Sequence, residues 1–372
     1  MITPTILIPG IKGTTLVNTN TLDFDTIWSG MQSKFETVFD LELQLDQRFE
    51  KEPKSIIERS DVEDLAYKEA VVIIQRETES PVYIFGYDWR KSCRENGKRL
   101  KAYVEYLKEK LPQKIKSFNF LTHSMGGLVF SCYLKELNGN YDVIAHAVMT
   151  VCPFQGSVSA LVALLIGEGG IKFPLFNSND IFRKIARTFP SVYELCPVYD
   201  KAIAFDKKYK EGILFNIYNP EHWQTNISSE EMFRKRLSEL KEFRIDNPGM
   251  LDLVSLDMKT RNRFVIIAGK GEDTKKRVVV QKKKPDRPTG NFFNFNLPDG
   301  DGDGTVPFES ATFYKKDILT LAVESKWHDG ATHGFFLNDG RVQTIIKRFL
   351  KDETDLKNWW ADVANTVTKV AI

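Results

Sequence analysis

The stretch Leu121-Thr122-His123-Ser124-Met125-Gly126-Gly127 is the most informative part of this sequence. It follows the β-rich run Ser117–Leu121 and precedes an apolar run, Leu128-Val129-Phe130, that opens a helical pattern. A serine between a strand and a helix, with glycine beside it, is typical of a sharp turn that presents the hydroxyl as a nucleophile. The alternative is a serine that caps an ordinary helix. Thr122 stands where such a turn usually has glycine, and it fits if its neighbour is small.

On both sides of this turn, short β-rich runs alternate with helical patterns. This order predicts an α/β-hydrolase fold, with a mostly parallel central sheet and helices on both faces. Helical spacing recurs at Leu100, Tyr103, Val104, Leu107 and Leu111 before the third strand, and at Val342, Ile345, Ile346, Phe349 and Leu350 after the last. The predicted strands are Thr5–Ile8, Val82–Phe85, Ser117–Leu121, Ala145–Val151, Arg263–Ala268 and Ile318–Val323.

The alternation fails between about residues 154 and 255. We therefore expect an α/β-hydrolase core at 1–153 and 256–372, with 154–255 inserted as a cap or lid. Within the insertion, Ser228 and Glu231 form a capping-box pattern and predict a helix from about Ser229. A second irregular stretch, 270–300, has the pattern of a basic β-hairpin.

A nucleophilic serine needs a histidine base, and in this fold the order along the chain is serine, acid, histidine. Of the five histidines, only His328 and His333 come late enough. His333 lies between the last predicted strand and the last predicted helix, where the fold places its base. His328, nearer the strand, is the competitor.

The acid is expected in the Asp-Gly-rich turn 299–307. Asp303, directly before Gly304-Thr305-Val306, is the best candidate, and Asp301 is the reserve. Alternating Asp and Gly also occur in calcium loops, but the twelve-residue layout with a terminal glutamate is missing. Two backbone amides should bind the oxyanion: Met125, after the nucleophile, and Ile11, in the glycine-containing loop after the first strand.

The bulk composition excludes several other classes of protein. A net charge of +2 over 372 residues gives no general attraction to nucleic acid. The four cysteines have no metal-ligand spacing, and Cys132 and Cys152 lie in apolar runs typical of buried thiols. No signal peptide or membrane-spanning run is visible, so we expect a cytoplasmic protein, with peripheral membrane contact as an option. The expected chemistry requires no metal or organic cofactor.

These motifs together resemble the lecithin:cholesterol acyltransferase family, which includes lysosomal phospholipase and phospholipid:diacylglycerol acyltransferases. The resemblance rests on six segments in order: Ile8–Gly13 with Trp28 downstream, Tyr87–Arg90, His123–Gly127, Gln155–Ser157 with Gly167-Glu168, Arg187–Ser191, and Gly302–Val306 with His333. It implies a triad of Ser124, Asp303 and His333, an oxyanion hole at Ile11 and Met125, and a mobile lid over an acyl groove. It also implies cleavage of a glycerophospholipid acyl ester through an acyl-serine intermediate.

Three functions remain open from the sequence. The first is a lipid acyl hydrolase or acyltransferase, favoured by three features: the apolar run Val158–Ile166, the basic run Lys275–Arg287, and helical spacing over Leu356–Ile372 that could place Trp359 and Trp360 at a membrane surface. Packing of each segment on the domain, or exposure of the basic run to solvent, is the alternative. The second function is an esterase or thioesterase for a small soluble or protein-linked acyl group, and the third is a non-catalytic binding protein. Asp88 and Arg90 precede Ser124, so we interpret them as an internal ion pair or hydrogen-bond anchor that shapes the floor of the site. The sequence identifies no activating partner.

Overall fold

The computed structural model describes most of the chain. The described residues are 3–21, 24–29, 38–46, 50–51, 55–112, 114–167, 178–210, 212–223, 225–246, 251–281, 293–294, 300–324, 332–354 and 358–372. None of the helices formed by these residues combines the length and the apolar composition of a membrane span.

A seven-stranded sheet forms the centre of the molecule, with the order β15-β14-β9-β7-β6-β1-β5. All neighbours run parallel except the edge pair β14 and β15. The six predicted strands are all present, with ends shifted by a residue or two. Their bounds are β1 Thr5–Ile8, β5 Val82–Ile84, β6 Phe118–His123, β7 Ile144–Thr150, β9 Phe264–Lys270 and β14 Leu319–Glu324, with β15 at Val367–Lys369.

Helices cover both faces of this sheet because successive strand residues point to opposite sides. Ile6 and Ile8 belong to one apolar cluster, which includes residues of α2 (Cys93–Lys110) and α3 (Gly126–Glu136). Leu7 belongs to a second cluster, with residues of α1 (Asp64–Thr78) and α11 (Gly340–Leu350). This is the α/β-hydrolase architecture that the strand and helix pattern predicts.

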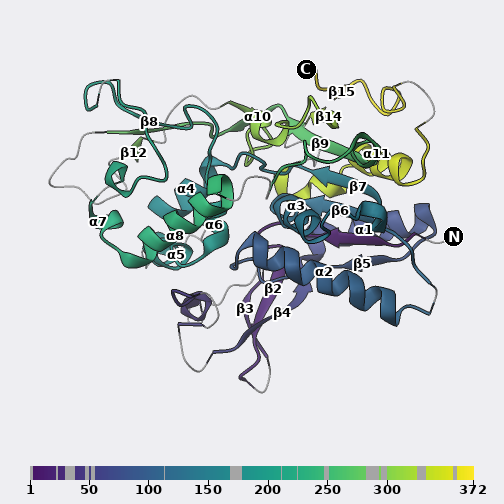
Figure 1. Ribbon diagram of the computed structural model, residues 1–372, viewed down its shortest axis with the longest axis horizontal. Coiled ribbons are helices and arrows are strands. Elements are labelled where there is room, and N and C mark those ends of the chain that lie inside the picture. The colour runs from purple at the N-terminus through teal and green to yellow at the C-terminus, as the bar shows by residue number, and fades with distance from the viewer. Residues whose placement is uncertain are drawn as a thin grey trace.

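Smaller sheets and short helices surround the central layers (Figure 1). Strands β2 (Thr14–Asn18), β3 (Asp25–Trp28) and β4 (Ile57–Val62) form an antiparallel sheet. The predicted 270–300 hairpin contains two antiparallel pairs, β10 (Glu272–Thr274) with β13 (Gly300–Gly302) and β11 (Val278–Val280) with β12 (Phe293–Asn294). Outside residues 154–255, the short helices of the described chain are η1 Val38–Leu41, η2 Tyr141–Val143, α9 Met258–Arg261, α10 Phe308–Ala311 and η7 His333–Asn338.

The segment 154–255 is mainly helical and lies at one end of the molecule, on the left in Figure 1. Its strand β8 (Ile203–Phe205) pairs in parallel with β11, which lies beyond residue 255, so the two parts share a sheet. The division into core and cap stays a prediction. Its helices are α4 Val158–Leu165, α5 Ser178–Ala186, α6 Pro190–Glu194, η3 Pro220–His222, α7 Thr225–Ser228, α8 Glu231–Lys241 and the π-helix η4 Glu242–Asp246.

The predicted capping box is wrong. Ser228 ends α7, and α8 begins at Glu231 with Glu230 as its N-cap and no side-chain cap hydrogen bond. The Glu230 carboxylate instead accepts a hydrogen bond from Arg187, 2.9 Å away. The N-cap side chain is thus engaged in a tertiary ion pair and not in a capping hydrogen bond.

The predicted C-terminal helix is also wrong over its described residues, 358–372. Turns are followed by β15, which pairs with the edge strand β14. Trp359 and Trp360 are buried, and the Trp359 ring stacks on Phe349 of α11. Both indoles therefore dock on the domain. The open edge of β14 offers backbone hydrogen bonds that outweigh the helical spacing of the side chains.

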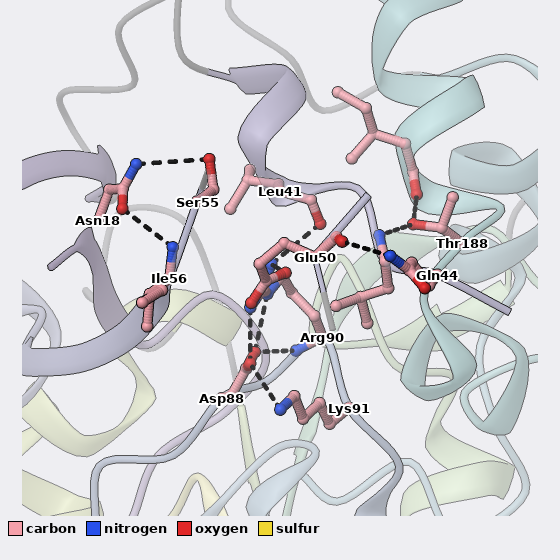
Figure 2. A network of polar contacts seen from close by, with 12 residues as sticks. Asn18, Leu41, Gln44, Glu50, Ser55, Ile56, Asp88, Arg90, Lys91 and Thr188 are labelled. Carbon is pink, nitrogen blue, oxygen red and sulfur yellow. Dashed lines mark hydrogen bonds and ion pairs between the residues drawn. The ribbon is translucent and has the colours of Figure 1, made fainter. Parts of the chain in front are cut away.

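The predicted ion pair of Asp88 and Arg90 is confirmed, with an additional partner, Glu50 (Figure 2). The Arg90 guanidinium is fully buried and lies 2.7 Å from the Asp88 carboxylate and 2.8 Å from that of Glu50. A further N–H group donates to the Leu41 carbonyl, which ties the N-terminal segment to the loop after β5. The four cysteines are free and buried, as expected for Cys132 and Cys152.

Candidate active site

Ser124 lies in a strained turn between β6 and α3. Its φ of 53° is in the left-handed region that non-glycine residues seldom occupy, and its amide donates to the Thr150 carbonyl at 3.0 Å. Gly127 is required by Cys152, because a Cβ there would lie 2.1 Å from Cys152 Sγ, whereas it would be in ordinary contact with Thr122 Oγ1 at 3.4 Å. Thr122 therefore fits beside the turn. The observed conformation is that of a nucleophile elbow.

Ser124, His333 and Asp303 form a continuous hydrogen-bonded chain. His333 Nε2 is 2.9 Å from Ser124 Oγ, and His333 Nδ1 is 2.8 Å from Asp303 Oδ2. The other carboxylate oxygen of Asp303 accepts the amides of Thr305 at 2.9 Å and Val306 at 2.7 Å. The Asp303 carboxylate held in this way accepts a hydrogen bond from Nδ1–H, which keeps the proton on Nδ1 and leaves Nε2 free to accept the serine proton.

Of the two alternatives from the sequence, only Asp301 lies in the described part of the chain. Asp301 is exposed, and its carboxylate accepts a hydrogen bond from the Gly271 amide. His328 lies outside the described residues. Within the described part of the chain, no group of histidine, cysteine, aspartate and glutamate side chains is arranged to hold a metal ion.

The two expected oxyanion donors lie in segments that meet at Ser124. Met125 directly follows the serine and is the N-cap of α3, whose dipole favours negative charge at this end. The loop after β1 packs against the serine so closely that a Cβ on Gly10 would lie 2.9 Å from Ser124 Cβ. Among the described residues, neither the Ile11 nor the Met125 amide has a hydrogen-bond acceptor. Both donors are therefore available to a ligand.

Ser124 and His333 open into a mainly apolar cavity of about 480 Å³. Aromatic side chains from distant segments form much of its wall, among them Trp28, Trp89, Phe182 and Phe189. Ala160 and Ala163 of α4 also line it, so part of the apolar run 158–166 contacts the cavity, while its valines and leucines are buried.

One cation, Lys12, belongs to this apolar wall. Its ammonium lies 5.1 Å from the centre of the Trp28 ring, whose indole N–H donates to the Lys12 carbonyl at 3.3 Å. Burial lowers the pKa of Lys12. Among the described residues, no carboxylate forms an ion pair with it. Lys12 carries no local sequence signal for this position, because the approach of Trp28 is a tertiary contact.

A second hydrogen-bonded chain joins the Gly10 amide to the His333 carbonyl through Tyr67 and His123. The Tyr67 hydroxyl lies 2.9 Å from both the Gly10 amide nitrogen and His123 Nδ1, and His123 Nε2 lies 2.7 Å from the His333 carbonyl oxygen. Chain order excludes His123 as the catalytic base, although its place directly before Ser124 is a signal in the sequence. Tyr67 carries no sequence signal of this kind.

Comparisons with known proteins agree with this fold. A sequence profile of the lecithin:cholesterol acyltransferase family matches residues 72–284, more than half of the chain. Lecithin-cholesterol acyltransferase-like 4 of Arabidopsis thaliana is 25% identical over 302 residues, which are 72% of this chain and 54% of that protein. The chain thus spans about half the length of this curated relative.

Among solved structures, a chain in the crystal structure of the Tle4-Tli4 complex has a TM-score of 0.65 at 16% identity, over 96% of this chain and 99% of that one. This likeness concerns the fold. The profile match over more than half of the chain shows the family: the chain belongs to the lecithin:cholesterol acyltransferase family, within the α/β-hydrolase superfamily.

Proposed function

We propose that this protein is a serine acyl-ester hydrolase or acyltransferase that acts on lipid esters, with a glycerophospholipid as acyl donor. The observation that carries the proposal is the position of Ser124: its Oγ lies 2.9 Å from His333 Nε2, at the wall of an apolar cavity of about 480 Å³. Membership of the family, and the name of the Arabidopsis relative, support acyl transfer chemistry.

The reaction proceeds in two steps. His333 Nε2 takes the Ser124 proton as Oγ attacks the acyl carbonyl, and Asp303 stabilises the imidazolium. The Met125 and Ile11 amides bind the oxyanion, with about 3 kcal/mol of transition-state stabilisation per donor. The leaving alcohol takes the proton from His333, and the acyl group stays on Ser124. Water or an acceptor alcohol then attacks this ester by the reverse sequence.

The cavity supports a long acyl chain, because apolar walls favour methylene groups by about 0.8 kcal/mol each. The Lys12 ammonium favours a substrate that also carries an anionic group. A half-buried ammonium without a carboxylate partner among the described residues lacks its counter-charge, and a lipid phosphate would supply it. An apolar cavity with a cation in its wall thus favours a phospholipid over a neutral acylglycerol.

Turnover of a graded set of esters tests the proposal, from short-chain nitrophenyl esters to phosphatidylcholine and diacylglycerol vesicles, with products identified by mass spectrometry. We expect fatty acid or a transferred acyl group from phospholipid, and none from Ser124→Ala. Preference for short soluble esters would favour the esterase or thioesterase alternative. Silence on every ester would favour the binding-protein alternative.

Lys12→Met isolates the anionic part of the proposal. Losing a charge-assisted contact should lower turnover of phosphatidylcholine about tenfold or more relative to diacylglycerol, because such contacts contribute about 1.5–3 kcal/mol. Lys12→Arg keeps the charge and should lose less. An equal loss on both lipids would show that Lys12 does not recognise phosphate.

Peripheral membrane contact and a cytoplasmic location are part of the proposal. The loop after β8 exposes Ile213 and Leu214, at 51% and 81% of their surface, close in sequence to Lys207 and Lys208. Apolar and basic side chains together favour an anionic lipid surface. Four free cysteines agree with a reducing compartment. Absence of co-sedimentation with anionic vesicles at low salt would contradict the membrane part.

A further inference from the structure

The chain Gly10–Tyr67–His123–His333 has a defined direction of proton donation. The Gly10 N–H group can only donate, so the Tyr67 oxygen accepts it, and the single phenol hydrogen is left for His123 Nδ1. The His333 carbonyl can only accept, so His123 Nε2 carries the imidazole proton. Every group in the chain is therefore satisfied by one tautomer of a neutral His123.

The surroundings agree with a neutral imidazole. His123 and Tyr67 are buried, with 4% and 2% of their surfaces exposed. Burial lowers the pKa of His123 to about 3 and outweighs the hydrogen bond to the His333 carbonyl, which alone would raise it. Burial also raises the pKa of Tyr67, which keeps its phenol protonated as the chain requires.

The chain connects three segments that must be held in one arrangement. Gly10 belongs to the loop of Ile11, His123 directly precedes Ser124, and the His333 carbonyl begins η7. Asp303 fixes the His333 side chain, whereas His123 holds its backbone. Hydrogen bonds therefore hold both the side chain and the backbone of His333. The same hydrogen-bonded chain also holds the loop of Ile11 through the Gly10 amide.

We infer that Tyr67 and His123 are positioning residues, which set the register of His333 and of the Ile11 loop against Ser124 through the hydrogen-bonded chain from Gly10 to the His333 carbonyl. The inference rests on the proposed function, because positioning matters only if Ser124 and His333 react. A reacting group displaced by about 1 Å can lose about a hundredfold in rate.

Three single substitutions separate the links of the chain. Tyr67→Phe removes the hydroxyl that joins Gly10 to His123. His123→Gln offers an amide N–H at the reach of Nε2 and can keep the bond to the His333 carbonyl. His123→Asn is shorter; its amide oxygen can accept from Tyr67 at the place of Nδ1, but it cannot reach that carbonyl. Tyr133→Phe is the matched control, because among the described residues this buried tyrosine has a hydroxyl without a hydrogen-bond partner.

The experiment measures kcat, KM and the rate of fluorophosphonate labelling of Ser124, beside thermal unfolding. We expect His123→Asn to lower kcat about a hundredfold with KM within about threefold, partial rescue in His123→Gln, and about a tenfold or greater loss in Tyr67→Phe. The double variant Tyr67→Phe/His123→Gln should lose little more than either single variant, because both break the same link. Tyr133→Phe should match wild type.

The inference would be overturned if folded Tyr67→Phe and His123→Asn proteins kept kcat within about twofold of wild type. It would also fail if Gln and Asn at position 123 lost the same amount, since the His333 carbonyl would then be irrelevant. Failure of the proposed function has a different signature: wild type itself would neither turn over esters nor be labelled at Ser124.

Discussion

Asp303→Asn tests the assignment of the acid with a change of a single atom type. In the native structure one carboxylate oxygen accepts the amides of Thr305 and Val306, and the other accepts His333 Nδ1–H. Asparagine has only one oxygen. If that oxygen keeps the two backbone donors, its NH₂ group faces Nδ1, which must then be unprotonated. The proton moves to Nε2, where it faces Ser124 and blocks proton abstraction.

The opposite orientation of the introduced asparagine is less stable. It would place the NH₂ group against two backbone N–H donors and leave both without an acceptor, at about 1–3 kcal/mol for each buried group. The wrong tautomer should therefore dominate. In serine proteases the corresponding change lowers kcat about 10⁴-fold, equivalent to about 5.5 kcal/mol. We expect the same order of loss in nitrophenyl ester turnover and in fluorophosphonate labelling.

Asp301→Asn is the matched control, since Asp301 is exposed and bonds only the Gly271 amide in the described structure. It should retain activity within about twofold. Circular dichroism and thermal unfolding would establish that both variants fold. A folded Asp303→Asn protein with more than about a tenth of wild-type activity, or an Asp301→Asn protein that is equally inactive, would refute the assignment.

Two further predictions concern buried charge. Arg90→Met leaves the carboxylates of Asp88 and Glu50 buried without their guanidinium and should lower the free energy of unfolding by about 3–5 kcal/mol. Lys68→Met, which removes an exposed ion pair, should change it little. Equal midpoints of the two variants in urea unfolding would contradict this prediction. The free energy of unfolding of wild type should decrease as the pH falls from about 6.5 towards 3, by up to about 1.4 kcal/mol per pH unit. The reason is that His123 accepts a proton near pH 6.5 in the unfolded chain but only near pH 3 in the folded protein. His123→Asn should lack this part of the slope, and identical slopes in the two proteins would count against a buried neutral imidazole.

Much of the core fold follows from local pattern. Each of the six predicted strands combines β-rich residues with a neighbouring helical pattern, and parallel pairing then leaves few arrangements. Chain order restricted the base to His328 and His333, and the Asp-Gly turn restricted the acid to a few residues. The structure brings Ser124, Asp303 and His333 within hydrogen-bonding distance, and their catalytic roles stay a prediction.

The features that local pattern could not give are those decided by distant partners. Trp359, Val363 and Val367 have helical spacing, but the open edge of β14 draws this segment into a strand. Glu50 pairs with Arg90 from forty residues away, and Tyr67 reaches His123 across fifty-six. Such contacts depend on how the elements pack, and neither composition nor spacing encodes them locally.

The most direct test of the central claim is to trap the acyl-enzyme. Wild type would be mixed with a long-chain nitrophenyl ester, quenched within milliseconds in acid, and analysed by intact and peptide mass spectrometry. We predict a burst of about one equivalent of nitrophenol and an acyl adduct on Ser124, absent in Ser124→Ala. Steady ester turnover without an adduct, or with the acyl group on another residue, would contradict the account.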